Sequence, residues 1–421
     1  MHKILPGFAI LVFLLILCSE SRGQSVVPSN YYFRSETLRA VSSDRKDTIR
    51  HLNLHDSTIY RMPEWVAHCI NLESLDISQT RIIQFPKWMK DLTKLERVIF
   101  NGGKKPLSPS SMIPVYEQGE SLAPPRFSNL PQVKYLEMRF HAWESAPMSI
   151  TKLKNLEKLI LSDNALQQFP NQLKKLKKLK QLDLARNAIE LPERWMSMPS
   201  LNKLDLRSNL IWKLPEGFER LPELRYLELG NNRLNVQDLN QGLKTTPPLR
   251  YLGLGRNELD SWPNVLSRMT TLEKLDLSQN GLKTLPEVGF GFLGNLVVLN
   301  LAFNQFQNGL EALEELPALK ELDLDHNQLY ELDFKVGKMR QLQTLVLSHN
   351  AFEYFPLTLF EVPQLKKCDL SFNRIANKPA QDWTKESDTY LWLLMKGNPI
   401  QGDQLQEFRA ECAEMGVMLD Y

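Results

Sequence analysis

The sequence lacks most of the features that crosslink or modify small exported domains. Of its 4 cysteines, the three beyond residue 23 are Cys69, Cys368 and Cys412, whose spacing indicates neither a disulfide framework nor a zinc site. No Asn-x-Ser/Thr glycosylation site occurs. The 51 basic and 49 acidic residues leave a formal net charge of +2, which does not favour nucleic acid as the partner. Packing must therefore hold the fold.

Motifs for catalysis and cofactor binding are also missing. The sequence has no Gly-x-Ser-x-Gly, His-Glu-x-x-His, phosphate-binding loop or paired Cys-x-x-Cys. Residues 289–294 match Gly-x-Gly-x-x-Gly, but that motif needs a strand before it and a helix after it, and here a strand is expected to follow. We therefore predict no enzyme activity, no cofactor, no small-molecule substrate and no metal.

A long hydrophobic run is present only near the start of the chain. It extends from Phe8 to Cys18, follows Lys3, and is too short to cross a bilayer comfortably. The small residues Ser21 and Gly23 follow, so residues 1–23 are predicted to be a signal peptide cleaved before Gln24. We expect a secreted or cell-envelope protein, with bacterial export mildly favoured. Lipidation of Cys18, the alternative, would be the only membrane attachment, and Leu17 stands where a small residue is needed.

A repeat of about 23 residues organises nearly all of the remaining chain. Its pattern, Leu-x-x-Leu-x-Leu-x-x-Asn, is clear in Leu156/Leu159/Leu161/Asn164. Successive copies are spaced by 22 to 25 residues, except for one gap of 38 residues. The first positions are Ile49, Leu72, Leu95, Val133, Leu156, Leu179, Leu201, Leu224, Leu249, Leu272, Leu296, Leu319, Leu342, Leu365 and Tyr390. Residues 49–400 are thus predicted to form one array of about fifteen turns.

These copies resemble the leucine-rich-repeat family, in its subtype with a Leu-Pro element. The resemblance implies an α/β solenoid, a right-handed horseshoe with a concave parallel β-sheet and short helices or 3-10 segments on the convex side. Each Leu-x-Leu segment suits a strand that buries one face against its neighbours. The asparagine at the ninth position can bond to nearby backbone groups, so we interpret that column as structural.

The remaining pieces are interpreted as convex segments, caps and loops. Leu-Pro pairs such as Leu214-Pro215 recur along the chain. The segments after such pairs carry apolar residues spaced by three, as Trp195/Met198/Leu201 do in the preceding turn, and this spacing predicts short convex helices. Cys69 and Cys368 occupy positions that are apolar in other turns and are predicted to be core residues. We assign residues 24–48 to an N-terminal cap that is helical over 31–41, 104–129 to an irregular inserted loop, and 401–421 to a C-terminal capping helix. An Asp403/Gln406 capping box and Gly416 are expected to bound that helix.

Side chains that alternate with the core leucines should form columns on the concave face. The third position reads Lys203, Tyr226, Tyr251 and Lys274, and the seventh and eighth supply Arg207, Asn231 and Arg256. Aromatic and arginine side chains are typical of binding hot spots, although exposed tyrosines also stabilise sheets through cross-strand packing. Both interpretations stay open.

Two further columns and one basic stretch complete the candidates. The eighth position continues as Phe303, His326, His349 and Phe372, where the histidine pair lacks a third ligand for a metal site. The fifth position is often acidic, which we interpret as charge pairing with adjacent lysines rather than a calcium site. The acidic residues are Asp183, Asp205, Glu228, Asp276, Asp323 and Asp369. Lysines 174, 175, 177, 178 and 180 are interpreted as a solvated convex face.

From these features we expect a non-catalytic module that binds a protein on its concave face, between about the seventh and fourteenth turns. One alternative is recognition of a glycan or polyanion, and another is a structural or adhesive surface repeat. A third is an intracellular signalling scaffold, which the predicted signal peptide disfavours.

Overall fold

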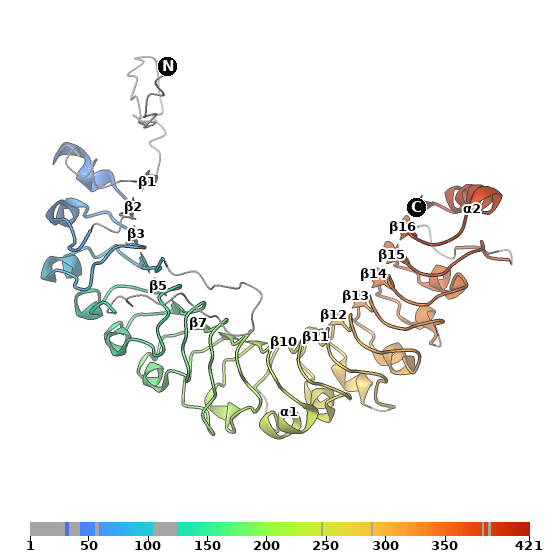
Figure 1. Cartoon of the computed structure of the whole chain (residues 1–421), viewed down its shortest axis with the longest axis horizontal. Coiled ribbons are helices and arrows are strands. Elements are labelled where there is room, and N and C mark those ends of the chain that lie inside the picture. Colours follow the sequence, from blue (N-terminus) through green and yellow to red (C-terminus); the bar gives the residue numbers. More distant parts are fainter. Residues whose placement is uncertain are drawn as a thin grey trace, which may run out of the picture.

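The chain forms a long open arc of stacked turns, with strands along the inner side and short helices along the outer side (Figure 1). The computed structural model describes residues 30–32, 43–54, 59–103, 124–245, 247–287, 289–332, 334–380, 383–385 and 389–421. The predicted signal peptide and most of the inserted loop therefore lie outside the described residues. Within those ranges, neither α-helix is long and apolar enough to cross a membrane.

The inner side is a single 17-stranded sheet in the described part of the chain, and each strand pairs in parallel with the next along the sequence. The strands are β1 (Asn30–Tyr32), β2 (His51–Asn53), β3 (Ser74–Asp76), β4 (Arg97–Ile99), β5 (Tyr135–Glu137), β6 (Lys158–Ile160), β7 (Gln181–Asp183), β8 (Lys203–Asp205), β9 (Tyr226–Glu228), β10 (Tyr251–Gly253), β11 (Lys274–Asp276), β12 (Val298–Asn300), β13 (Glu321–Asp323), β14 (Thr344–Val346), β15 (Lys367–Asp369), β16 (Leu391–Leu394) and β17 (Val417–Asp420). Strands β2 to β16 are those of the fifteen predicted turns.

The two ends of the sheet differ from the prediction. Residues Asn30–Tyr32 form β1 and pair with β2, rather than beginning a helical cap. At the other end, α2 (Gly402–Glu414) starts after Gln401 without a side-chain cap, so the predicted Asp403/Gln406 capping box does not form. Gly416 ends this turn with a φ of 68°, as expected, and the chain then adds β17 beside β16. Each end thus extends the sheet by one strand.

The outer side consists mainly of 3-10 helices, as the resemblance implied. They are η2 (Ser43–Thr48), η3 (Glu64–His68), η4 (Lys87–Asp91), η5 (Phe127–Asn129), η6 (Met148–Lys152), η7 (Asn171–Lys175), η8 (Phe218–Arg220), η9 (Asn264–Arg268), η10 (Phe290–Leu293), η11 (Glu311–Glu315), η12 (Val336–Lys338) and η13 (Leu357–Glu361). Proline occupies the N-cap of η3, η4, η6, η7, η9 and η13, because its fixed φ suits the entry into a turn.

Two turns depart from this outer pattern. The segment with Trp195 and Met198 is buried as predicted but forms no helix, and an isolated bridge joins Arg194 to Glu216 there. In the turn that begins at Leu224, two extra residues allow a true α-helix, α1 (Val236–Gly242). The Asn235 side chain caps α1 by accepting a hydrogen bond from the Asp238 backbone N–H.

The core is one continuous hydrophobic cluster that runs from Ile49 to Val417. Cys69 and Cys368 are fully buried in it, which confirms the prediction that both are core residues, and Cys412 of α2 is buried as well. Burial raises the pKa of Cys69 to about 11 and that of Cys412 to about 12. These thiols therefore act as small apolar side chains.

The asparagine column forms a ladder that ties each turn, from the one that begins at Leu156 onward, to the turn before it. In each of these residues the side-chain Nδ2 donates to the sixth-position carbonyls of its own and the preceding turn, over distances of 2.8 to 3.1 Å. The Oδ1 atom accepts a backbone N–H of the preceding turn. The ladder comprises Asn164, Asn187, Asn209, Asn232, Asn257, Asn280, Asn304, Asn327, Asn350, Asn373 and Asn398. The prediction of a structural role is confirmed.

A histidine replaces asparagine in the turn that begins at Val133. His141 Nε2 lies 2.6 Å from the Phe100 carbonyl oxygen, which is the sixth position of the preceding turn. Because a carbonyl only accepts, Nε2 carries the proton. The ring stacks on Trp143 at 4.0 Å, and burial lowers the His141 pKa to about 4 although the bond to Phe100 opposes that shift. His141 thus fills the asparagine's role as a neutral donor.

We predict that Asn232→Ala lowers the free energy of unfolding by about 2–4 kcal/mol, because the backbone N–H groups of Asn209 and Ile211 lose their buried acceptor. Urea unfolding followed by circular dichroism measures the change. The control is Asn202→Ala, which removes one exposed bond to the Glu223 carbonyl and should change stability by less than about 0.5 kcal/mol. Equal effects of the two substitutions would refute the ladder's contribution.

We also predict an acid-labile step from His141. Its folded-state pKa of about 4 lies below the ordinary 6.5, so the stability from the neutral ring is complete above pH 6.5 and is lost as pH falls toward 4. The loss should reach about 3 kcal/mol. Unfolding free energies measured between pH 7 and 4 should decrease less steeply in His141→Asn, which has no group that titrates in that range. An unchanged slope would contradict this assignment.

Candidate concave binding face

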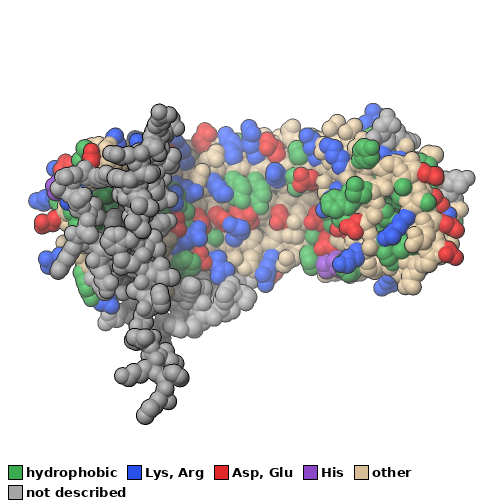
Figure 2. Space-filling model, turned by 90° about the horizontal axis from the view of Figure 1, so that it is seen from above, with side chains coloured by type: hydrophobic (Ala, Val, Ile, Leu, Met, Phe, Trp, Pro, Cys, Tyr) green, Lys and Arg blue, Asp and Glu red, His purple; other side chains and the backbone are tan. Residues whose placement is uncertain are grey.

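Side chains of equal repeat position lie directly beside one another on the concave face. The parallel register places Lys203 beside Tyr226, Tyr226 beside Tyr251, and Tyr251 beside Lys274. Figure 2 looks onto this face and shows hydrophobic side chains gathered over the middle strands, with acidic and basic side chains around them. The predicted third-position column is therefore a contiguous row across β8 to β11.

The two tyrosines of this row form a parallel stack. The rings of Tyr226 and Tyr251 lie 4.1 Å apart at an interplanar angle of 6°, and Lys203 Nζ lies 4.0 Å from the Tyr226 ring centroid. The Tyr251 hydroxyl donates to Glu228 Oε2 at 2.7 Å. Gly253 leaves space for this carboxylate, since a Cβ there would meet Glu228 Oε1 at 2.1 Å. Contacts within the protein thus hold the two tyrosine rings in position.

Burial disfavours ionisation of Glu228, the carboxyl group that the Tyr251 hydroxyl contacts. Glu228 is 5% exposed, and burial, aided by the charge of Asp205, raises its pKa despite hydrogen bonds from Tyr251 and the Gly230 backbone N–H. Burial also raises the pKa values of Tyr226 and Tyr251, so both hydroxyls stay protonated at neutral pH. Tyr251 therefore has a structural role in the sheet, as one of the two sequence-based interpretations predicts, and its side chain stays partly exposed.

The predicted polar residues around the row behave differently from one another. Arg207 forms a bidentate pair with Asp205, with N–O distances of 3.1 and 2.8 Å. Asn231 Nδ2 donates to Ser208 Oγ at 2.9 Å, whereas Arg256 and Lys274 are exposed. The cations near the row are thus of two kinds: Arg207 is held in an ion pair, whereas Arg256 and Lys274 face solvent.

The acidic fifth-position column serves the backbone rather than pairing with lysines. Its carboxylates accept the backbone N–H two residues further on, as Asp183 does from Ala185 at 3.0 Å and Asp276 from Ser278 at 2.9 Å. The ion pairs found along this column involve arginines, including Arg139 with Asp183. Our prediction of lysine pairing is therefore wrong, because the third-position lysines lie over aromatic rings or in solvent.

The eighth-position column forms a second aromatic row beyond the strand ends. Phe303, His326, His349 and Phe372 stack in sequence with centroid distances of 4.1, 3.9 and 4.5 Å. All four have a φ between 50° and 56°, as do residues of many other types at this position, so the turn sets the conformation. Asp325 contacts both histidines, which supplies the third ligand type that sequence reasoning did not find.

A third cluster near the start of the sheet was also missed. Arg97 lies 3.7 Å above the Tyr135 ring centroid, and Lys158 Nζ lies 5.4 Å from it. The Tyr135 hydroxyl donates to Glu137 Oε2 at 2.6 Å. Burial opposes ionisation of Glu137, but hydrogen bonds from Tyr135 and Asn101 and the nearby arginines outweigh it and lower its pKa. Arg97, Tyr135 and Lys158 all occupy the third position of their turns, so repeat position could have identified this cluster, although these repeats are less regular.

The convex lysines are exposed on and after η7, in keeping with a solvated face. Lys178 donates to Asn155 at 2.7 Å, and Lys180 pairs with Glu157 at 2.8 Å. The glycines of residues 289–294 bracket η10, which precedes β12, so this segment has the opposite order from a dinucleotide-binding turn.

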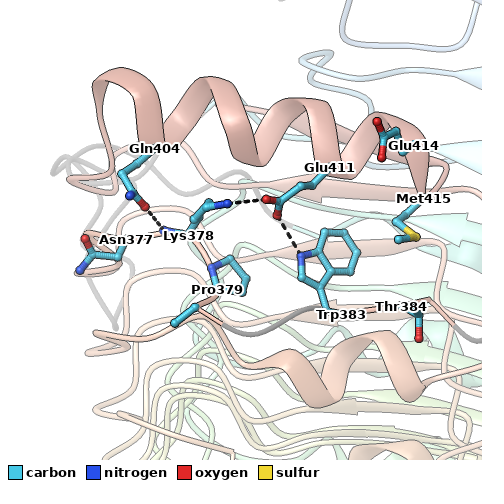
Figure 3. Close-up of a pocket in the computed structure, with 10 residues that line it drawn as sticks. Asn377, Lys378, Pro379, Trp383, Thr384, Gln404, Glu411, Glu414 and Met415 are labelled. Carbon is cyan, nitrogen blue, oxygen red and sulfur yellow. Dashed lines mark hydrogen bonds and ion pairs between the residues drawn. The ribbon is translucent and has the colours of Figure 1, made fainter.

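A cavity of about 590 Å³ lies between α2 and residues 377–380 and 383–384 (Figure 3). Two side chains of its lining meet the Glu411 carboxylate: Lys378 pairs with it, and Trp383 Nε1 donates to it at 3.2 Å. Trp383 also stacks on Phe360 at 4.0 Å. Lys378 and Trp383 thus fasten the C-terminal helix to the last turns.

Comparison with known proteins assigns the repeats. Models of the leucine-rich repeat match residues 154–193, 190–234, 247–306, 270–329 and 317–375. No curated protein matches the sequence.

Among solved structures, a leucine-rich-repeat protein of Leptospira interrogans matches at 21% identity and a TM-score of 0.60, covering 94% of this chain and all of that one. Toll of Drosophila, in its complex with Spatzle, matches at 20% identity and a TM-score of 0.64, over 94% of this chain and 61% of that chain. An internalin of Listeria monocytogenes matches at 17% identity and a TM-score of 0.51, over 90% and 89%. These likenesses concern the fold.

Proposed function

Since the chain is a leucine-rich-repeat protein, we propose that it is an exported, non-catalytic module that binds a protein on its concave face. Proteins of this family are generally binding modules without enzyme activity, and the Toll structure of similar fold contains the protein ligand Spatzle. The partner would contact the row Lys203, Tyr226, Tyr251 and Lys274 together with Arg256.

The observation that carries this proposal is the stacked tyrosine pair. Rigid aromatic rings offer large contact area at a small entropic cost, and a site ordered before binding avoids part of the ordering penalty. Both rings are half-buried, and the cations Lys203 and Lys274 flank them. This arrangement suits a partner that presents an apolar or aromatic group beside acidic side chains.

We predict that Tyr226→Ala/Arg256→Ala/Lys274→Ala weakens capture of the partner from envelope and extracellular extracts at least about tenfold, or ~1.4 kcal/mol. This variant spares Tyr251, because removing that hydroxyl would also disturb the buried Glu228. Affinity capture with residues 24–421, with folding checked by circular dichroism, provides the measurement.

The matched control is Lys174→Ala/Lys175→Ala/Lys177→Ala on the exposed convex side. A protein lost only with the concave variant supports the proposal. Loss only with the convex variant, together with strong salt dependence, would favour a glycan or polyanion instead. Equal capture of many targets by all forms would favour the structural or adhesive alternative and overturn concave recognition.

Export rests on the apolar run of residues 8–18 and the small residues that follow it. We predict that N-terminal sequencing of protein from the envelope or medium yields Gln24 as the first residue. A product in the cytosol that still begins at Met1 would contradict export and revive the signalling-scaffold alternative.

A further inference from the structure

We infer that Asp325, His326 and His349 form a binding site for one borderline divalent cation such as Zn²⁺. One imidazole nitrogen from each histidine and one carboxylate oxygen lie within 4.8 Å of one another. Two imidazoles and a carboxylate are a donor set that suits zinc, nickel or copper better than calcium or magnesium. This site is separate from the tyrosine row.

The donor atoms converge because one carboxylate bridges two turns. His326 Nδ1 lies 2.6 Å from Asp325 Oδ2, and His349 Nδ1 lies 3.0 Å from Asp325 Oδ1. Both imidazoles therefore present the same nitrogen to the same side of their shared stack. Without an ion, each Nδ1 donates its proton to the carboxylate of Asp325, which only accepts. Coordination requires the neutral ring to carry its proton on Nε2 instead, which frees the Nδ1 lone pair for the ion.

Binding of the ion requires a local rearrangement. Zinc bonds of about 2.1 Å in a tetrahedral site put neighbouring nitrogen and oxygen ligands roughly 3.4 Å apart, whereas the two Nδ1 atoms now lie 2.6 and 3.0 Å from different oxygens of Asp325. The carboxylate must withdraw by less than about 1 Å, and the two imidazole rings, which are stacked 3.9 Å apart at 20°, must turn so that the lone pair of each Nδ1 points to the ion.

Surrounding groups hold the ligands in position. The Phe303 and Phe372 rings pack on the outer faces of the two imidazoles at 4.1 and 4.5 Å. Ser348 Oγ donates to Asp325 Oδ1 at 2.6 Å, which would orient a coordinating carboxylate. The backbone N–H groups of His326 and His349 are fixed by bonds of 3.0 Å to the next turn.

The local charge and exposure also favour a cation. Asp323 accepts the backbone N–H of Asp325 at 3.0 Å, so a second carboxylate lies close behind the first. The two histidine side chains are 40% and 39% exposed, which lets an ion enter and leaves its remaining coordination position to water. A half-exposed cluster with nearby carboxylates favours cations.

The test is isothermal titration of the untagged chain with ZnCl₂ after removal of metals by EDTA and dialysis. We expect one saturable site per chain that MgCl₂ does not fill. His326→Gln/His349→Gln should weaken zinc binding at least 100-fold, whereas His68→Gln, an exposed histidine of η3, should leave it unchanged. Zinc binding of equal affinity and stoichiometry in the double variant, or no saturable binding to the wild type, would overturn the site.

A second measurement guards against misfolding of the double variant. Asp325→Asn keeps the size of the side chain but supplies a poor ligand, so zinc should raise the Tm of the wild type and have little effect on this variant. Visible absorption of the Co²⁺-loaded wild type should show the strong bands of a tetrahedral site with nitrogen and oxygen ligands. Equal Tm increases in both proteins would assign the zinc to other surface groups and refute the proposal.

Discussion

A buried carboxamide at the ninth position of the turns from Leu156 onward satisfies backbone groups that the strand leaves unpaired as it bends away from the sheet. The group donates to two carbonyls and accepts one N–H, so it uses nearly its whole hydrogen-bonding capacity. A strand of three residues has few hydrogen bonds with which to fix its register against a neighbour. The asparagine side chain helps to fix that register, because it bonds both to its own turn and to the preceding one. The long arc in Figure 1 depends on that constraint being met at almost every step.

A constant spacing is also what gives the concave face its chemistry. Parallel strands of equal register place like positions side by side, so Tyr226 meets Tyr251 and His326 meets His349 as stacked rings. In a sheet with variable register the same residues would be scattered. The rows are therefore a consequence of the ladder, while the residues within them are free to vary.

Much of this organisation was predictable, because it depends on residues that repeat. The fifteen repeat strands, the asparagine ladder, the outer 3-10 segments and the core cysteines all follow from positions that recur every 22 to 25 residues. What could not be predicted depends on single occurrences. Strands β1 and β17 lack the repeat pattern, and His141 takes over a ladder position through a ring nitrogen that no asparagine pattern would identify.

The same distinction applies to the candidate sites. The columns containing Tyr226 and His326 were apparent from repeat position. The orientation of Asp325 between two histidines, and the fit of Glu228 over Gly253, depend on side-chain conformation and appear only in three dimensions. Tyr135 and Arg97 belong to irregular turns, where the column is harder to follow by spacing alone.

Each ladder asparagine bonds only to its own turn and to the preceding one. The hydrogen bonds of the ladder therefore join adjacent turns and never reach a more distant one. Genetic duplication of a whole turn between the tyrosine row and the histidine row would therefore preserve the ladder while increasing the separation between the two rows. Unequal recombination between repeats could in this way adjust the distance between two surface sites in increments of one strand spacing, about 4.8 Å, without altering either site.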